Sequence, residues 1–141
     1  NIKVEEVCNA EIEFTEKEQL IKARFGQGVF RKRLLELESK CRLTGIMDLQ
    51  FLIASHIKPW RDCNNAERLD GNNGLLLSPH VDRLFDRGWI SFADNGSLLV
   101  SNDATRAVMT SWGLGELNNK QNFSDKQKNY LQYHRTHVFK G

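Results

Sequence analysis

The chain has 141 residues and a mass of 16.3 kDa, which fits one compact domain. It is 40% hydrophobic and 27% charged, a composition that argues against intrinsic disorder for most of the chain. Its longest unbroken apolar run, residues 51–54, is too short to cross a membrane. The net charge is only +2, but residues 21–35 carry five Lys or Arg and no acid, and residues 120–141 carry five against one Asp. Two basic segments favour a polyanion as partner, with solvated helix faces as the alternative.

The three cysteines are Cys8, Cys41 and Cys63, and no two of them form a Cys-x-x-Cys pair. An odd number of cysteines argues against a disulfide framework and for a reducing compartment. A zinc site with four protein ligands would therefore need His or Asp to complete it.

The first ordered elements are predicted to be helices, after an extension or linker over residues 1–14. Residues 15–18 have the Thr-x-x-Glu form of a capping box and predict a helix through about Arg24. Gly26 and Gly28 are expected to interrupt it. A second helix is expected next, because apolar residues recur at helical spacing at Val29, Phe30, Leu34, Leu35 and Leu37.

The middle of the chain predicts two short strands separated by a loop. Residues 41–45 predict a tight turn, and residues 49–57 predict a strand that ends near His56. Residues 58–73 are polar and predict a long loop, which in a compact domain is usually functional or mobile. Residues 74–77 predict the second strand.

The last third predicts a helix, a hairpin and two further helices. Residues 78–86 begin with Ser-Pro, a good N-terminal cap, and form the first of these helices. Strands over 89–93 and 97–101 flank an Asp-Asn-Gly turn. Helices are expected over 103–112 and from Ser124 onward. The resulting order, ααββαββαα, is that of a small α+β domain.

One stretch concentrates groups suited to phosphodiester hydrolysis. His56 stands at a strand end as a potential base, with Asn73 as an amide that could orient it. Asp82 and Asp86 are four residues apart on a helix, so they share a face and could share a hard cation. His80 lies two residues from Asp82 and cannot easily join them on a regular helix. Each of these residues taken alone also has a structural explanation, and the aspartates could simply pair with neighbouring arginines.

Three segments resemble the HNH endonucleases, in particular the branch found in bacterial restriction-type and anti-phage defence nucleases. They are residues 41–45 (CRLTG), 54–60 (ASHIKPW) and 73–86 (NGLLLSPHVDRLFD). Flanking residues 26–31 and 130–140 also resemble that branch, so the resemblance extends from about residue 20 to the end. It implies a ββα-metal fold with its core at 41–88, flanking helices and an extra β-hairpin. It also implies a metal-dependent DNA endonuclease that acts in restriction or phage defence.

Carried onto this chain, the resemblance makes His56 the general base and Asn73 the residue that holds it through a hydrogen bond. Asp82 falls nine positions after Asn73, where the family has its final histidine, a metal ligand. Asp86 matches a second helix ligand of some relatives. His80 lies two residues before the position of that final histidine. If the spacing (the register) of the motif decides, Asp82 and Asp86 are the metal ligands. If the order of residue types His-Asn-His decides, His80 is a catalytic and metal-binding residue. Both alternatives stay open at this point.

Two departures from the family pattern bear on the metals. Many relatives have an acidic or His ligand just before the base, where this chain has Ser55. Many also bind a structural zinc through two Cys-x-x-Cys knuckles; here Cys41 stands with Thr44, and Ser78 and Val81 occupy the second pair, so we expect no structural zinc. Two carboxylates favour Mg²⁺ or Mn²⁺, whereas a His80 ligand would favour Mn²⁺, Ni²⁺ or Zn²⁺.

The expected partner is DNA, with no membrane involved. The resemblance also implies a bacterial cytoplasmic protein, leaves a homodimer open, and suggests a specificity or sensor domain outside this chain. The alternative function is a catalytically inactive nucleic-acid-binding domain on the same scaffold. The residues expected to contact phosphates are Lys22, Arg24, Arg31, Lys32, Arg33, Lys58, Lys126, Lys128 and Arg135.

Overall fold

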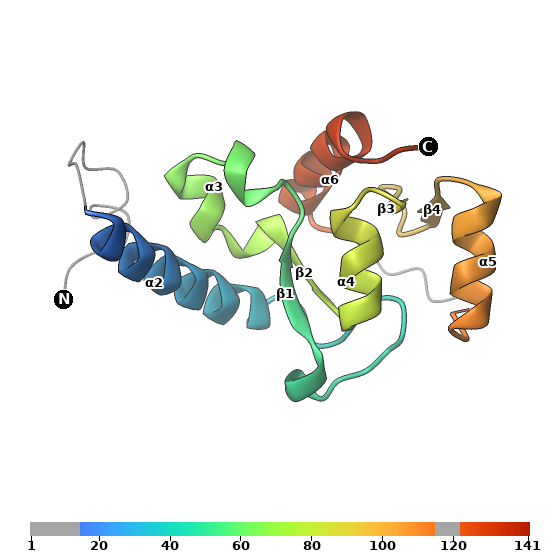
Figure 1. Cartoon of the computed structure of the whole chain (residues 1–141), viewed down its shortest axis with the longest axis horizontal. Coiled ribbons are helices and arrows are strands. Elements are labelled where there is room, and N and C mark those ends of the chain that lie inside the picture. The colour runs from blue at the N-terminus through green and yellow to red at the C-terminus, as the bar shows by residue number, and fades with distance from the viewer. Residues whose placement is uncertain (1–14, 115–121) are drawn as a thin grey trace.

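The computed structural model describes residues 15–114 and 122–141, and within them it is a mixed α+β structure, as predicted (Figure 1). The main elements are α2 (Glu16–Leu35), β1 (Ile53–His56), α3 (Asn65–Leu69), β2 (Gly74–Leu77), α4 (Pro79–Asp86), β3 (Ile90–Phe92), β4 (Leu98–Val100), α5 (Asp103–Ser111) and α6 (Asp125–His137). Single 3₁₀ turns occur at Leu49–Phe51, Trp60–Asp62 and Gly71–Asn73. Of the helices in this part of the chain, none is long and apolar enough to span a membrane.

The centre of the molecule is the antiparallel pair β1–β2, which lies between α2 and α4 (Figure 1). The register pairs Ile53 with Leu77 and His56 with Gly74. Every residue of β2 is buried, because helices cover both faces of this strand. That explains why β2 is a continuous apolar run instead of an alternating pattern.

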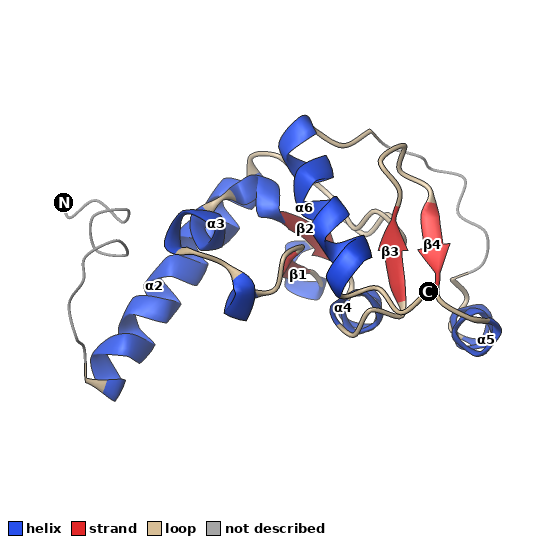
Figure 2. Ribbon diagram, turned by 90° about the horizontal axis from the view of Figure 1, so that it is seen from above, coloured by secondary structure: helices blue, strands red, loops and turns tan. Residues whose placement is uncertain are grey.

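A second antiparallel pair, β3–β4, extends the molecule away from α2. The predicted hairpin is confirmed, with Gly96 at a φ of 88°, the left-handed conformation that favours glycine. In the view of Figure 2, α5 lies beyond β4 at the end of the molecule opposite α2. The C-terminal helix α6 packs against β3 and against the 3₁₀ turn Gly71–Asn73, so it joins the hairpin to the β1–β2 centre.

The prediction that Gly26 and Gly28 interrupt the first helix is wrong. The helix α2 is continuous for 20 residues. A glycine inside a helix costs about 1 kcal/mol, and the burial of Phe30 and Leu34 in the core offsets that cost.

The segment 58–73 is not the structureless loop that its polarity predicted. It contains two 3₁₀ turns and α3, which begins with a capping box between Asn64 and Glu67. The preceding strand is also shorter than predicted: Leu49–Phe51 is a 3₁₀ turn capped by Asp48, and β1 starts only at Ile53.

Gly74 gives Phe30 room to reach the β1–β2 pair. A Cβ atom at Gly74 would lie 2.5 Å from Phe30 Cζ and 3.2 Å from Leu34 Cδ1. We therefore expect Gly74→Ala to lower the free energy of unfolding by about 1–3 kcal/mol, the usual cost of overpacking a core. Urea unfolding measures this change. Gly28→Ala is the control, because a Cβ there meets nothing within 4 Å; equal stability of both variants would contradict the prediction.

Candidate active site

His56 lies at the end of β1 in a pocket of aromatic rings. Its ring stacks on Phe30 of α2 with the centroids 3.6 Å apart and an interplanar angle of 17°. Trp60 meets it edge-on at 5.4 Å. The Nε2 atom is 2.9 Å from the carbonyl oxygen of Arg68, in α3. The guanidinium of Arg68 in turn lies over the Trp60 ring, 4.7 Å from its centroid.

These contacts fix the protonation state of His56. A carbonyl oxygen can only accept a hydrogen bond, so Nε2 carries the proton and the neutral ring keeps its lone pair on Nδ1. Burial lowers the pKa of His56 below its usual 6.5; the hydrogen bond to Arg68 opposes this shift only in part. At neutral pH the residue is therefore an imidazole with one nitrogen able to accept a proton.

The resemblance predicted a hydrogen bond from the Asn73 side chain to the His56 ring. In the structure Asn73 is fully buried, and its side chain bonds to other groups instead. Its Oδ1 accepts a 2.8 Å hydrogen bond from the Lys58 backbone N–H. Its Nδ2 donates to the carbonyl of Glu67 at 3.1 Å and to the Cys63 sulfur at 3.4 Å. Asn73 thus joins the two ends of the segment 58–73, which follows His56. The difference arises because the folded segment 58–73 brings backbone groups to the amide that the sequence pattern did not place there.

A second group of polar side chains lies on the α4 side of β1. Side chains alternate along a strand, so Ser55 faces α4 while His56 faces α2. The half-buried Asp82 has a raised pKa because of its burial; a hydrogen bond from Ser55 opposes this shift, and the nearby Asp86 carboxylate adds to it. Asp82 and Asp86 both lie on the helix α4, one turn apart, and the Asp86 side chain is exposed.

The oxygen atoms of Asp82 and Asp86 fit a hard cation that keeps several of its own waters. Within residues 15–114 and 122–141, no group of three or more His, Cys, Asp and Glu side chains is placed to hold a metal ion. Mg²⁺ keeps several of its waters and is commonly bound through one or two carboxylates plus substrate phosphates. Asp82 and Asp86, whose mutual repulsion a cation would relieve, meet that requirement with oxygen atoms alone.

His80 lies elsewhere on α4. Its half-buried ring packs edge-on against Trp112 at the end of α5, with the centroids 5.4 Å apart. His80 therefore contacts Trp112, whereas Asp82 accepts a hydrogen bond from Ser55 of β1.

Cys41 has a structural environment. It is fully buried, and its sulfur accepts hydrogen bonds from the backbone N–H groups of Thr44 at 3.5 Å and Ser78 at 3.3 Å. The hydroxyls of Thr44 and Ser78 are 2.7 Å apart and bond to each other. The turn after α2 is thus joined to the start of α4 by one bond from a backbone N–H to the Cys41 sulfur and one bond between two hydroxyls.

His134, on α6, is also structural. It is buried, and its ring stacks on Phe85 at 3.9 Å. Its Nε2 donates to the Phe85 carbonyl, and its Nδ1 accepts from the Ser91 hydroxyl, both at 2.8 Å. Burial lowers the pKa of His134 to about 4. Both nitrogens are occupied, so this neutral ring links α6 to α4 and β3 and leaves no nitrogen for catalysis.

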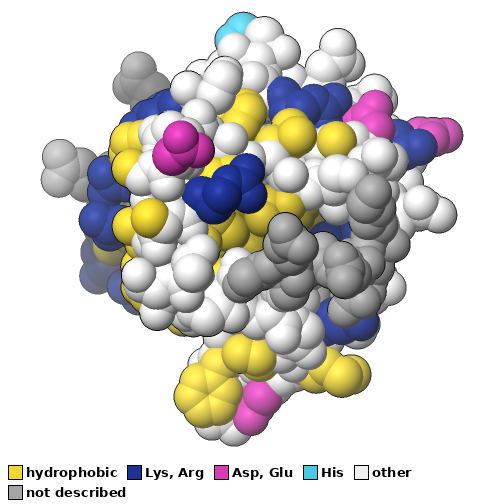
Figure 3. All heavy atoms as spheres, turned by 90° about the vertical axis from the view of Figure 1, so that its right-hand side faces the viewer, with side chains coloured by type: hydrophobic (Ala, Val, Ile, Leu, Met, Phe, Trp, Pro, Cys, Tyr) yellow, Lys and Arg dark blue, Asp and Glu magenta, His cyan; other side chains and the backbone are white. Residues whose placement is uncertain are grey.

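The residues expected to contact phosphates divide into two sets. Five have acceptors within the protein: Arg31, Arg33, Lys58, Lys128 and Arg135. Lys22 is half-buried and also interacts within the protein. Arg24, Lys32 and Lys126 are exposed. Figure 3 views the molecule from the end opposite α2, and Lys and Arg side chains are scattered over that face too, with hydrophobic side chains between them. The exposed set is therefore the better candidate for a DNA interface than the complete list.

Three residues around His56 were not identified by the sequence analysis: Phe30, Trp60 and Arg68. Phe30 was predicted as a core residue of a helix, and nothing in its spacing indicated contact with His56. Arg68 acts through its backbone carbonyl, so its side-chain identity carried no signal. Trp60 belongs to the motif at 54–60, and that membership was the one available indication of its role.

Comparison with known proteins identifies a family over the middle of the chain. Residues 41–93 match the family model described as HNH endonuclease. That range contains β1, α3, β2, α4 and β3, and with them His56, Asn73, Asp82 and Asp86. No curated protein matches the chain.

Proposed function

Because residues 41–93 belong to the HNH endonuclease family, we propose that this chain is a metal-dependent DNA endonuclease with His56 as its general base. The observation that carries the proposal is the bond between His56 Nε2 and the Arg68 carbonyl. It leaves Nδ1 as the proton acceptor on a ring that burial keeps neutral. The proposed fold of the core is ββα-metal, formed by β1, β2 and α4.

His56 would take the proton from the water that attacks the scissile phosphate. Phe30 and Trp60 limit the ring to one orientation, and Arg68 fixes which nitrogen carries the proton. A base positioned in this way typically contributes about 10²–10⁴-fold to the rate.

Asp82 and Asp86 are the residues that would hold a divalent cation, with Mg²⁺ or Mn²⁺ favoured by their oxygen atoms. When bound, such a cation supplies charge stabilisation to the phosphate oxygens. Ser55 would keep Asp82 in position through its hydrogen bond. His80, against Trp112, has no part in this proposal.

The direct test is a plasmid nicking assay with Mg²⁺ or Mn²⁺ and with EDTA as the control. Cation-dependent conversion of supercoiled to open-circular DNA is the expected result. The alternative, an inactive nucleic-acid-binding domain, is favoured by Ser55, which stands where many relatives have an acidic or His metal ligand. It predicts DNA binding without nicking at any cation concentration.

The pH dependence of cleavage should show the lowered pKa of His56. Protonated His56 cannot accept a proton, so activity is present above the pKa of His56 and lost as the pH falls through it. Because burial lowers that pKa, the midpoint of the acid limb in kcat/KM should lie below pH 6.5. A midpoint at or above 6.5 in nicking rates measured from pH 4.5 to 8 would contradict the role of His56.

Lys32 and Arg24 should contribute to DNA binding through phosphate contacts. Both side chains are exposed on α2. We expect each alanine variant to reduce the slope of log Kd against log salt concentration by about 1, the effect of one lost phosphate contact. Fluorescence anisotropy with a short duplex measures the slope. Arg106→Ala, an exposed residue of α5 outside the basic segments, is the control and should leave the slope unchanged.

A role in restriction or phage defence, a homodimer and an additional specificity domain remain predictions from the sequence. A break in both strands would require two active sites, which is the reason for considering a second copy. Measuring whether nicked or linear plasmid accumulates first would test that requirement.

A further inference from the structure

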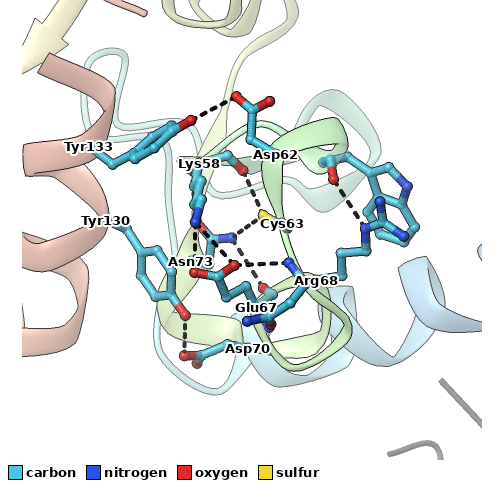
Figure 4. Close-up of polar contacts among 11 residues, drawn as sticks. Lys58, Asp62, Cys63, Glu67, Arg68, Asp70, Asn73, Tyr130 and Tyr133 are labelled. Carbon is cyan, nitrogen blue, oxygen red and sulfur yellow. Dashed lines mark hydrogen bonds and ion pairs between the residues drawn. The ribbon is translucent and has the colours of Figure 1, made fainter. Parts of the chain in front are cut away.

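The segment that holds His56 is bound by the C-terminal helix α6, which lies outside residues 41–93. The hydroxyl of Tyr130 donates a 2.8 Å hydrogen bond to Asp70 Oδ2. The hydroxyl of Tyr133 donates a 3.0 Å bond to Asp62 Oδ2. Figure 4 shows both tyrosines pointing from α6 toward this segment.

The two bonds lie on either side of α3, the short helix that supplies the carbonyl for His56. Asp62 is the last residue of the 3₁₀ turn before α3, and Asp70 is the C-terminal capping residue that directly follows α3. Tyr130 and Tyr133 are the only tyrosines of the chain, and their spacing of three residues places them on one face of α6. Through these two bonds, α6 is attached to the chain just before and just after α3.

Further contacts stabilise the same arrangement. Lys58, two residues after His56, lies over the Tyr133 ring with its Nζ 4.8 Å from the centroid. The same Nζ pairs with Glu67 of α3 at 2.9 Å. At the start of α6, the Ser124 hydroxyl donates to Asn72 Oδ1 at 3.0 Å.

Both tyrosine hydroxyls stay protonated at neutral pH and so remain hydrogen-bond donors. The pKa of Tyr130 is raised by burial and by its bond to Asp70, and the pKa of Tyr133 is raised by its bond to Asp62. Each bond joins a hydroxyl to a carboxylate, which is stronger than a bond between neutral groups.

We infer that Tyr130 and Tyr133 are positioning residues of the active site: by fixing α3, they keep the Arg68 carbonyl on His56 Nε2. The inference rests on the proposed function only for its effect on catalysis. Its effect on the His56 hydrogen bond can be measured without any cleavage.

The test uses the whole chain with Tyr130→Phe, Tyr133→Phe and the double variant, which remove the hydroxyls and keep the rings. In ¹⁵N-histidine-labelled protein, NMR measures how fast the His56 Nε2 proton exchanges with solvent. We expect exchange about tenfold faster or more in the double variant, because loosening α3 opens the bond to Arg68. We also expect kcat to fall about tenfold with KM unchanged, since orientation of a base affects the chemical step.

Thr136→Ala is the matched control, because that exposed α6 hydroxyl bonds within its own helix, to the Gln132 carbonyl at 2.9 Å. Its exchange rate and kcat should equal those of the unchanged protein. Tyr133→Phe removes a bond that lies at the surface, so it provides a folded variant even if the double variant unfolds.

Unchanged Nε2 proton exchange in folded Tyr133→Phe and Tyr130→Phe would overturn the inference, whether or not kcat falls. Faster exchange in a protein whose His56→Ala variant still cleaves DNA would support the positioning role and refute the proposed function. Failure of the positioning inference can therefore be distinguished from failure of the proposed function.

Discussion

Replacing His56 by alanine is expected to lower the rate of plasmid cleavage by about 10²–10⁴-fold, the usual contribution of a positioned general base. The physical reason is the loss of the only nitrogen in this site that combines a lone pair with a fixed orientation. DNA affinity should change little, because the ring contacts Phe30, Trp60 and the Arg68 carbonyl. Single-turnover cleavage and anisotropy measure the two quantities separately.

His80→Ala is the matched control for that experiment. It also removes one histidine, but one whose ring packs against Trp112. Cleavage by this variant should stay close to that of the unchanged chain. If His80→Ala lost as much activity as His56→Ala, the assignment of the site by register would have to be abandoned.

Adding free imidazole to His56→Ala should restore part of the rate, because it replaces the missing proton acceptor.

The second large effect is expected from Asp82→Asn. This change keeps the shape of the side chain and removes its charge. Loss of a group that merely hydrogen-bonds to a metal ligand already lowers metal affinity by about 10–100-fold. Loss of a ligand's charge should therefore lower the affinity for Mn²⁺ by that factor or more. Cation-dependent cleavage should be lost with it. Calorimetric titration and the rise in Tm on adding Mn²⁺ measure the binding.

The same substitution should not destabilise the metal-free protein. Burial and the neighbouring Asp86 raise the pKa of Asp82, so its charged form is unfavourable in the absence of a cation. At neutral pH the Tm of Asp82→Asn without metal should therefore equal or exceed that of the unchanged chain. Asp103→Asn, an exposed residue in the first turn of α5, is the control and should keep the full Mn²⁺-dependent shift. A normal shift in Asp82→Asn would show that the cation is bound elsewhere.

The sequence alone determined the elements whose signals are local. The Asp-Asn-Gly turn specified the hairpin β3–β4, and Ser-Pro marked the start of α4. The spacing of Asp82 and Asp86 placed both on one helical face, since four residues make about one turn. The run Gly74–Leu77 specified a buried strand to the residue. In each case the backbone preference of a few adjacent residues agrees with the final structure.

Only the tertiary structure decided how His56 is held. The stack with Phe30 brings together residues 26 positions apart, and it depends on the space above Gly74. The continuity of α2 through two glycines follows from core packing, which outweighs the local cost of about 1 kcal/mol for each glycine. The proton on His56 Nε2 is fixed by a backbone carbonyl. A backbone group is the same in every residue, so no sequence pattern could identify Arg68 as its source.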